Sequence, residues 1–460
     1  MDRGRRQGFA VAIIGGGVVG CALLREFALA GCEPLLLEKG GDILSGASKA
    51  NSAILHTGYD AEPGTLEAEL VRRGRQRYLE LAPRFGLPVE KTGGLVVAWK
   101  EEERPRLDAI LLTAQRNGIR ELELLDRDAL LACEPELAGS AVAAARVPGE
   151  YVVDPWTTPL AYALQAIQHG AEIRRGAEVR EIVRNGSRWQ LVTTRGPVEA
   201  EIVVNAAGLF ADRIEAMTGL PEFRILPRKG QFLVYDKPAR RLLNAILYPL
   251  PRPRSKGVLL TPTVFGNLLV GPTSEPVENR ADTSTDAAVL RGLREIATTR
   301  LPALRRQRVV AAYAGLRPAT ERGDYVIAAD PTRRWITVAG IRSTGLTAAL
   351  GIAEHVRELF ERHFGALSPA RPRHWPEVPR LAEREPRPYT VGGNGEIVCF
   401  CELVTRREVE AALSGPLPAR DLGALKRRTR CTMGRCQGFY CGWRLARFLD
   451  SALADGRAAS

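Results

Sequence analysis

Cysteine is scarce over most of the chain, because the first 398 of its 460 residues contain only Cys21, Cys32 and Cys133. No run of about 18 apolar residues is present, which argues against a membrane-spanning helix. The basic N-terminal residues are not followed by an apolar segment with a cleavage site, which argues against a secretory signal. We therefore expect a cytoplasmic protein whose membrane contact, if any, is peripheral and at the inner membrane face. Thiols stay reduced there, so clustered cysteines indicate metal or redox chemistry before disulfides.

Acidic residues are also in deficit, with 53 Asp and Glu against 65 Lys and Arg, a formal charge of +12. No nucleic-acid-binding motif accompanies this excess, so we expect no nucleic-acid partner. A basic surface attracts small anions or an acidic membrane face without defining a function. The length and a hydrophobic content of 45% predict two or three domains with sizeable cores.

The most informative early stretch is FAVAIIGGGVVGCALLREFALAGCEPLLLEKG, residues 9–40. An apolar strand leads into Gly15, Gly17 and Gly20, a helix follows, and a second apolar strand ends at Glu38. In such a unit the glycines permit the tight turn, the approach of a pyrophosphate and close helix packing, and the acid binds a ribose. The helix N-terminus faces the phosphates with free N–H groups. The unit predicts a dinucleotide site but does not by itself distinguish FAD from NAD.

The next segment, GGDILSGASKANSAILHTGYDAEPGTLEAELVRRG, is a small polar loop that leads to His56 and then to a helix. It resembles the corresponding segment of the D-amino-acid-oxidase-like superfamily of FAD enzymes. Its amino-acid sequence is most similar to that of the glycerol-3-phosphate oxidase and dehydrogenase group, with the L-2-hydroxyglutarate oxidase group second. This resemblance implies that the cofactor is FAD, that the loop passes along its pyrophosphate, and that His56 reaches the flavin ring.

Later motifs follow in the order that the resemblance implies, namely GAEVREIVRNGSRWQLVTT, AEIVVNAAGLFADRI and RRWITVAGIRSTGLTAALGIAEHV. The implied fold is an α/β, Rossmann-like FAD-binding domain of the two-dinucleotide type over residues 1–367. An antiparallel-sheet substrate domain is expected from insertions at about 85–150 and 222–312. The expected cofactor-binding residues are Gly15, Gly17, Gly20, Glu38, Lys39, Ser48, Asn51, Ser52, Val179, Ala207, Gly208, Gly345 and Leu346.

Oxidation of an alcohol or amine by flavin requires a base for the O–H or N–H proton. Of the five histidines only His56 lies in the flavin-side loop, and it also matches the family position, so we predict it to be the base. The alternative is a structural or merely flavin-contacting histidine. Arg317 in YAGLRPAT and Lys256 in RSKGVLLTPT match positions near the substrate in the glycerol-phosphate group, where cations would bind an anionic substrate. The alternative for both is an ordinary surface cation.

The end of the chain differs in composition from the rest. Residues 368–390 contain six prolines and many charges, which predicts an extended, semi-rigid linker. A small domain at 391–460 then contains C-x-C, 34 residues, and C-x4-C, with helical segments between and after. Such a pattern is compatible with structural disulfides, a four-cysteine zinc site or a 2Fe–2S cluster. The reducing compartment argues against disulfides, and the spacing favours the cluster over zinc.

The wording CFCELVTRREVEAA…LKRRTRCTMGRCQGFYC resembles the bacterioferritin-associated-ferredoxin-like 2Fe–2S module found at the ends of several flavin dehydrogenases. The resemblance implies that Cys399, Cys401, Cys436 and Cys441 are the cluster ligands. Cys431 matches a position that is usually small and not a ligand, so it is surplus.

A second intact G-x-G-x-x-G unit is missing, so NAD(P) is not expected as the electron acceptor. We expect an FAD-dependent dehydrogenase of a small anionic hydroxy compound, first glycerol 3-phosphate and second L-2-hydroxyglutarate or another 2-hydroxy acid. Its electrons would leave through the cluster to an acceptor protein, a partner subunit or a quinone. Two alternatives stay open: an amino-acid dehydrogenase of the sarcosine, hydroxyproline or opine type, and a non-catalytic docking or sensing protein.

Overall fold

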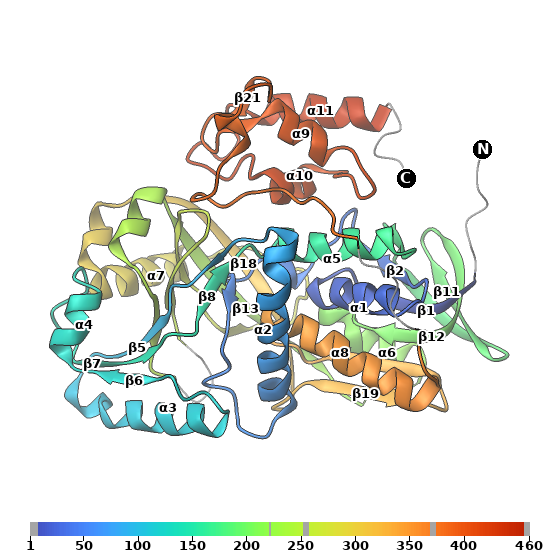
Figure 1. Cartoon of the computed structure of the whole chain (residues 1–460), viewed down its shortest axis with the longest axis horizontal. Helices are drawn as coiled ribbons and strands as arrows, with labels where there is room; N and C mark the ends of the chain where they lie inside the picture. The colour runs from blue at the N-terminus through green and yellow to red at the C-terminus, as the bar shows by residue number, and fades with distance from the viewer. Residues whose placement is uncertain (1–7, 220–221, 252–256, 369–373, 455–460) are drawn as a thin grey trace.

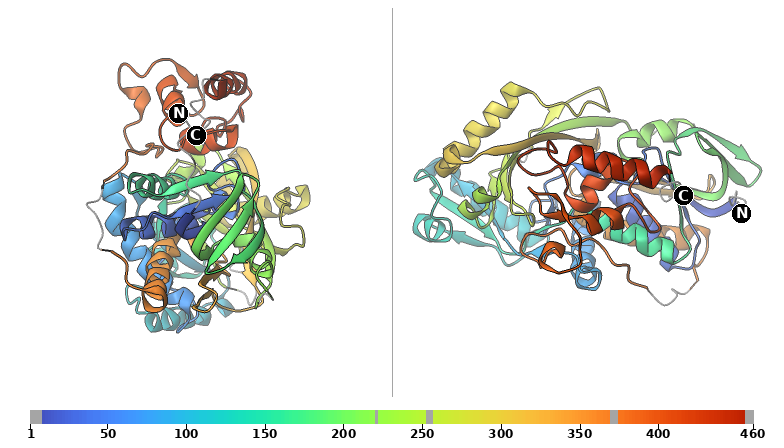
Figure 2. Two further views of the ribbon diagram at one scale, coloured as in Figure 1. Left: turned by 90° about the vertical axis from the view of Figure 1, so that its right-hand side faces the viewer. Right: turned by 90° about the horizontal axis from the view of Figure 1, so that it is seen from above.

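The computed structural model describes residues 8–219, 222–251, 257–368 and 374–454. Two large sheets lie side by side, and a small C-terminal module (residues 391–454) lies against one side of the pair (Figure 1). Seen from above, the module lies over the region where the two sheet units meet (Figure 2). None of the described helices is long and apolar enough to cross a membrane.

The first sheet is built around the N-terminal strand β1 (Gly8–Ile14), which pairs in parallel with β2 and β12. Strands β1 and β2 are apolar along almost their whole length because both faces of a parallel sheet are covered. The strand order is β10-β11-β12-β1-β2-β9, and β20 joins β12 and β19. The other strands are β2 (Leu35–Glu38), β9 (Glu172–Arg175), β10 (Val179–Asn185), β11 (Arg188–Thr193), β12 (Gly196–Asn205), β19 (Val326–Asp330) and β20 (Trp335–Ala339).

Helices α1 (Val18–Leu29), α2 (Leu66–Phe85), α5 (Thr157–Gln168) and α8 (Gly345–Phe364) pack together beside this sheet. Helices α2 and α8 cross very closely, because a Cβ at Gly74 would lie 2.3 Å from the Thr347 carbonyl oxygen. A Cβ at Gly351 would likewise lie 2.5 Å from the Leu70 carbonyl oxygen. This close crossing fixes the first turns of α8 against α2. Helix α6 (Ala211–Ala216) follows β12.

The second sheet takes strands from two separate stretches, residues 94–147 and 225–320. Its pairs are antiparallel except for β5 with β14, which are parallel. The longest pairing joins β13 and β18, which stay in register from Ile225–Thr320 to Val234–Ala311 and shift by one residue before the last pair, Tyr235–Val309. Its strands are β5 (Gly94–Ala98), β6 (Glu123–Leu125), β7 (Ala143–Val147), β13 (Ile225–Tyr235), β14 (Ile246–Pro249), β15 (Leu259–Pro262), β16 (Leu268–Gly271), β17 (Glu275–Pro276) and β18 (Val309–Thr320).

Smaller elements complete these two units. Helices α3 (Pro105–Arg116), α4 (Arg127–Cys133) and α7 (Ala287–Arg300) pack on the second sheet. A three-stranded sheet of β3 (Ile54–Leu55), β8 (Tyr151–Val153) and β4 (Val89–Glu90) joins the two units close to His56.

The C-terminal module has its own small core, which includes Val404, Val409, Leu425 and Leu445. It consists of β21 (Ile397–Cys399), β22 (Val404–Thr405), α9 (Arg406–Ala412), α10 (Leu422–Thr429) and α11 (Gly442–Ala454). Helix α9 begins with a capping box, in which Thr405 and Glu408 satisfy each other's backbone N–H groups.

The described part of the proline-rich segment, residues 374–390, packs on the rest of the protein instead of spanning solvent. Trp375 meets the edge of Phe85 on α2, with ring centroids 4.7 Å apart. Leu381 and Ala382 are buried in the core beside the second sheet. The apolar side chains between the prolines thus hold the described part of the expected linker against the folded protein.

Candidate flavin and substrate site

A cavity of about 1230 Å³ begins at the carboxyl end of β1 and continues between the two sheets. Of the expected cofactor residues, all except Gly20 line it, together with His56 and Arg317. Lys256 lies outside the described residues, although Pro251 and Gly257 on either side of that gap line the cavity. The structure thus brings one set of residues, widely spaced in sequence, to a single elongated cavity.

The glycine-rich turn has the geometry that its spacing predicts. Gly15 adopts φ +114°, and a Cβ there would lie 2.5 Å from the Ala206 carbonyl oxygen. A Cβ at Gly20 would lie 1.8 Å from the Gly15 carbonyl oxygen, so Gly20 allows helix α1 to pack against β1. Gly20 therefore serves the close packing of α1 on β1 and does not line the cavity. The first N–H of α1, from Val18, donates to Ser48 Oγ at 3.0 Å.

Glu38 holds the turn from the end of β2. Its Oε2 accepts the Gly16 N–H and its Oε1 accepts the Gly40 N–H, each at 2.7 Å. Burial raises the pKa of Glu38, while these two bonds and the neighbouring Lys39 oppose the rise. The carboxylate lines the cavity with remaining acceptor capacity, as a ribose-binding acid requires.

The N-terminus of α8 opens onto the same cavity through Gly345 and Leu346. The preceding Thr344 donates from Oγ1 to Glu67 Oε1 at 2.7 Å, and its hydroxyl lies 2.6 Å from the Tyr325 hydroxyl. These contacts hold the first turn of α8 in place. The positive end of the helix dipole therefore faces the cavity, where it favours negative charge.

His56 is positioned by α8 and by a buried acid that the sequence did not reveal. The His56 N–H donates to Thr347 Oγ1 at 3.0 Å, and His56 Nδ1 makes an ion-pair contact with Glu150 Oε2 at 3.1 Å. Glu150 is fully buried and accepts hydrogen bonds from the N–H and hydroxyl of Thr57 and from the Tyr248 hydroxyl. Glu150 precedes a buried strand in PGEYVV, a context that does not distinguish it from a surface turn residue.

The electrostatics of this pair favour an ionised Glu150. Burial alone would raise its pKa, but His56 and the hydrogen bonds from Thr57 and Tyr248 lower the pKa of Glu150 to about 2. An ionised carboxylate 3.1 Å from Nδ1 favours the imidazole tautomer with its proton on that atom, in which Nε2 is the acceptor. The side chain of His56 is 12% exposed, so the ring is enclosed but reachable from the cavity.

Two arginines face the cavity from neighbouring strands, Arg317 on β18 and Arg228 directly opposite on β13. Arg317 Nη2 donates to the Thr273 carbonyl oxygen at 3.1 Å, and Arg228 Nε donates to Ser274 Oγ at 2.9 Å. Gly230 leaves the space that Arg317 occupies, because a Cβ there would lie 2.8 Å from Nη2.

Among the described residues neither guanidinium has a carboxylate within ion-pair distance. Burial, with the charge of Arg228 second, lowers the pKa of Arg317 to about 10. Arg228 was missed from the sequence because only the β13–β18 register reveals that it faces Arg317. Two adjacent cations without a carboxylate define a site for an anion.

The cysteines of the C-terminal module lie close together at its β21 end. Cys399, Cys431 and Cys441 are buried in the core of the module, and Cys401 packs against the same core. The neighbouring Cys431, with backbone N–H groups of Thr432 and Glu402, lowers the pKa of Cys399, and the backbone N–H groups of Tyr440 and Gly438 lower the pKa of Cys436. Within the part of the chain that the structure describes, no three His, Cys, Asp or Glu side chains converge well enough to hold a metal ion. The geometry therefore leaves the ligand set open, and it places Cys431 in contact with an expected ligand.

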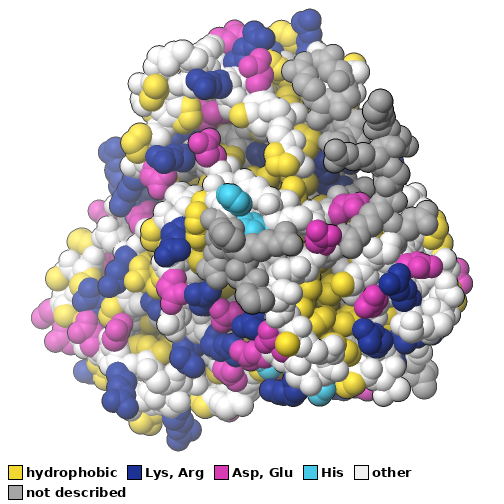
Figure 3. Space-filling view, turned by 45° about the vertical axis from the view of Figure 1, so that its right-hand side comes forward, with side chains coloured by type: hydrophobic (Ala, Val, Ile, Leu, Met, Phe, Trp, Pro, Cys, Tyr) yellow, Lys and Arg dark blue, Asp and Glu magenta, His cyan; other side chains and the backbone are white. Residues whose placement is uncertain are grey.

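Charges of both signs are interspersed on the face drawn in Figure 3, without a broad patch of one sign. This face therefore presents no basic groove.

The fold, the glycine-rich turn and the elongated cavity define an FAD-binding α/β oxidoreductase. The family model for FAD dependent oxidoreductases (DAO) matches residues 10–359, and the chain belongs to this family. It is 34% identical over 454 residues to a glycerol 3-phosphate dehydrogenase of Caloramator mitchellensis, covering 97% of this chain and 94% of that protein.

Two further relatives differ in how much of the chain they cover. The solved structure of the dithionite-reduced L-α-glycerophosphate oxidase of Mycoplasma pneumoniae with FAD bound matches with a TM-score of 0.75 and 27% identity. It covers 81% of this chain and 100% of the oxidase. A mitochondrial L-2-hydroxyglutarate dehydrogenase of Caenorhabditis elegans is 31% identical over 58% of this chain and 63% of its own length. These comparisons confirm the predicted FAD enzyme and its DAO-type fold.

Proposed function

We propose that this FAD-dependent oxidoreductase is a dehydrogenase that oxidises glycerol 3-phosphate and releases the electrons through its C-terminal module. The observation that carries the substrate class is the pair Arg228 and Arg317, two cations in the cavity without a carboxylate partner in the described structure. A phosphate dianion satisfies two guanidinium groups, each of which binds oxygens as a fork. The similarity to glycerol 3-phosphate dehydrogenases and oxidases supports the same assignment.

The catalytic step assigned to this chain is proton removal. Bound FAD would accept the hydride from the carbon that bears the substrate hydroxyl. His56 Nε2 takes the hydroxyl proton, and ionised Glu150 stabilises the imidazolium that results. The backbone bond to Thr347 ties the position of His56 to the same helix whose N-terminus faces the cavity.

The residues of the cofactor site fit an FAD molecule. The glycine-rich turn and α1 would hold the pyrophosphate, Glu38 the ribose, and the backbone of Val179 the adenine. The start of α8 would stabilise negative charge on the flavin ring. The remaining members of this assignment are Lys39, Ser48, Asn51, Ser52, Ala207, Gly208, Gly345 and Leu346. Lys256 keeps its assignment as a third cation near the substrate from the resemblance alone.

The C-terminal module is proposed to hold a 2Fe–2S cluster on Cys399, Cys401, Cys436 and Cys441. Support comes from the grouping of Cys399, Cys401 and Cys441 in the module core and from the lowered pKa values of Cys399 and Cys436, since thiolates are the cluster ligands. Four non-glycine residues near the cysteines adopt left-handed backbone conformations, a costly arrangement that recurs at functional sites. They are Leu403, Arg430, Thr432 and Gln437.

The cluster assignment has a direct spectroscopic test. Cys436→Ser should abolish the visible iron–sulfur absorption of the anaerobically purified protein, whereas Cys431→Ser should retain it. Both variants should retain the flavin bands, which serve as the internal control. Bleaching by Cys431→Ser with a normal spectrum for Cys436→Ser would reverse the ligand assignment.

The electron exit is assigned to the cysteine end of the module. Phe400, Phe439, Tyr440 and Trp443 are each more than 60% exposed and lie next to the cysteines in sequence. Phe439 and Tyr440 form an edge-to-face pair with ring centroids 5.2 Å apart, and exposed aromatic side chains are enriched at protein-docking surfaces. This favours an acceptor protein or partner subunit over direct reduction of a small molecule.

The experiment that tests the substrate is anaerobic bleaching of the bound flavin with glycerol 3-phosphate, L-2-hydroxyglutarate and a panel of amino acids. Rapid bleaching by glycerol 3-phosphate alone supports the proposal. Faster bleaching by a 2-hydroxy acid or an amino acid would replace it, and no bleaching by any compound would favour a non-catalytic role.

A further inference from the structure

We propose that the C-terminal module clamps the cofactor loop, residues 39–48, and that Asp42 is the positioning residue through which it does so. The loop connects Glu38 to Ser48, and its residues Lys39, Gly46, Ala47 and Ser48 line the cofactor cavity. The inference concerns retention of FAD and holds whichever substrate the enzyme oxidises.

Asp42 is buried, with 1% of its side chain exposed, and the cations that meet it come mainly from the module. Arg428 on α10 binds it with both terminal nitrogens, at 2.6 Å to Oδ2 and 2.8 Å to Oδ1. Arg427 Nη2 adds a third bond at 3.0 Å to Oδ2. Arg175 on β9 lies 3.5 Å from Oδ1 and also donates to the Pro418 carbonyl oxygen of the module.

The loop transmits this hold to the glycine-rich turn. The Ser45 hydroxyl donates to the Asp42 carbonyl oxygen, which closes the loop on itself. The Leu44 N–H donates to the Gly16 carbonyl oxygen at 2.8 Å, inside the turn that would hold the pyrophosphate. Ser48 at the far end accepts the Val18 N–H at the start of α1. A displacement of Asp42 therefore moves backbone that forms the wall of the cofactor cavity.

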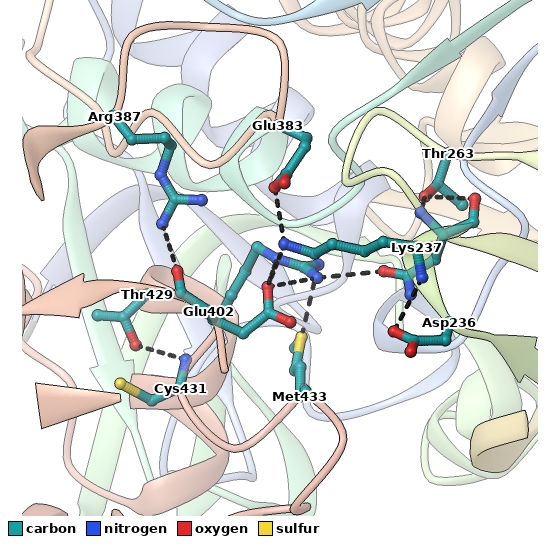
Figure 4. Close-up of polar contacts among 12 residues, drawn as sticks. Asp236, Lys237, Thr263, Glu383, Arg387, Glu402, Thr429, Cys431 and Met433 are labelled. Carbon is teal, nitrogen blue, oxygen red and sulfur yellow. Dashed lines mark hydrogen bonds and ion pairs between the residues drawn. The ribbon is translucent and has the colours of Figure 1, made fainter. Parts of the chain in front are cut away.

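The module is anchored at a second point, on the unit that contains the second sheet (Figure 4). Lys237 reaches both Glu383 at 2.7 Å and Glu402 of the module at 3.6 Å. Arg430 pairs with Glu402 at 2.9 Å and lies over the Phe265 ring, 4.2 Å from its centroid. Since the module contacts both units, its position is fixed independently of Asp42, and it can act as a rigid support for the loop.

The charge balance explains why the contact matters. Burial alone would raise the pKa of Asp42, but the hydrogen bonds and charge of Arg428, with Arg427 and Arg175, lower it below its usual value. Without the module arginines the carboxylate would keep only Arg175, 3.5 Å away, as a cationic partner, so the loop would open to hydrate it. The geometry therefore makes the closed loop depend on the docked module.

The test uses the full-length holoenzyme and two substitutions of the contact, Asp42→Asn and Arg428→Gln. Release of FAD after dilution is followed by the rise of flavin fluorescence, and it should be at least about tenfold faster in both variants. Arg428→Lys, which keeps the charge but not the two-pronged bond, should be intermediate. Arg444→Gln is the matched control, because Arg444 pairs with Glu396 inside the module and should release FAD at the wild-type rate.

Hydrogen–deuterium exchange of the same proteins without FAD distinguishes the clamp from a general loss of stability. Exchange should rise selectively in residues 39–48 of the Asp42 and Arg428 variants. Unchanged FAD release and unchanged loop exchange in both variants would overturn the proposal. An equal effect of Arg444→Gln, or exchange that rises throughout the protein, would also overturn it, because the module would then act only through global folding.

Discussion

Arginines occupy two regions of this protein in opposite electrostatic states. At the module interface Arg428 and Arg430 are buried against Asp42 and Glu402, so their charges are neutralised within the protein. In the cavity, Arg228 and Arg317 pair with no carboxylate among the described residues. Their partners there are backbone carbonyl and hydroxyl oxygens. A compensated arginine is part of the structure, whereas an uncompensated one in a cavity requires an anionic ligand. We propose that this difference separates structural cations from substrate-binding cations in a chain with 65 Lys and Arg.

The largest expected effect is that of replacing His56, the residue towards which the cavity arginines would orient the substrate. His56→Ala should leave FAD bound but reduce the rate of anaerobic flavin reduction by roughly 10²–10⁴-fold, because the proton loses its acceptor. Stopped-flow absorbance of the flavin gives the rate, and the flavin spectrum confirms loading. Flavin-reduction kinetics equal to those of the wild type would remove His56 from the catalytic role.

Substitution of the cavity arginines tests whether an arginine without a carboxylate partner matters more for substrate binding than a paired one. Arg317→Gln should lower kcat/KM for glycerol 3-phosphate by the equivalent of about 2–5 kcal/mol, the range for truncating one partner of a buried charge pair. Arg342 lines the same cavity but is already paired with Glu67 at 2.7 Å, so Arg342→Gln should have a much smaller effect. Steady-state kinetics with a dye acceptor measures both. Equal losses would show that compensation does not distinguish the two classes.

Glu150 adds a pH dependence that neither arginine region has. Its pKa in the folded protein is about 2, below its usual value of 4.5. A depressed carboxyl pKa stabilises the folded state above the ordinary pKa, and this stabilisation, on the order of 3 kcal/mol, is lost as the pH falls from about 4.5 towards 2. The wild type should therefore lose unfolding free energy over that range more steeply than Glu150→Gln. Urea unfolding at a series of pH values measures the two slopes, and parallel slopes would contradict the assignment.

The smallest expected effect is that of Arg228→Gln. Arg228 is held by both the hydroxyl and the carbonyl oxygen of Ser274, so part of its role is to fix β17 against β13. We expect KM for glycerol 3-phosphate to rise about tenfold, roughly 1.4 kcal/mol, with the rate of flavin reduction at saturation little changed. A fall in that saturated rate without a change in KM would place Arg228 outside the substrate site.

Local sequence motifs predicted the cofactor-binding turn. Arg228 and Glu150 were missed because their places in the site depend on strand pairing between distant segments. Gly15, Gly17 and Glu38 lie within one strand–helix–strand unit, where spacing alone determines their relation. The facing of Arg228 and Arg317 depends on the register of two strands that are separated by a helix and several strands. Glu150 reaches His56 only because a three-stranded sheet joins the segments that contain them.

The C-terminal module shows the same limit in another form. The cysteines could be located from the sequence, but their shared place in the core of the module does not reveal which four would bind the proposed cluster. The packing of residues 374–390 was not predicted, because proline content describes the backbone and says nothing about where Trp375 or Leu381 is buried.

The contact between Asp42 and Arg428 joins residues 386 positions apart, almost the full length of the chain. During synthesis the glycine-rich turn and β2 leave the ribosome early, yet their buried acid meets its counter-charge only when α10 has been made. Domains generally fold in the order of their synthesis, and this pairing sets a late step for a site that begins at the N-terminus. Stable loading of the flavin would then follow the synthesis of α10, and a chain terminated before α10 would retain its cofactor poorly.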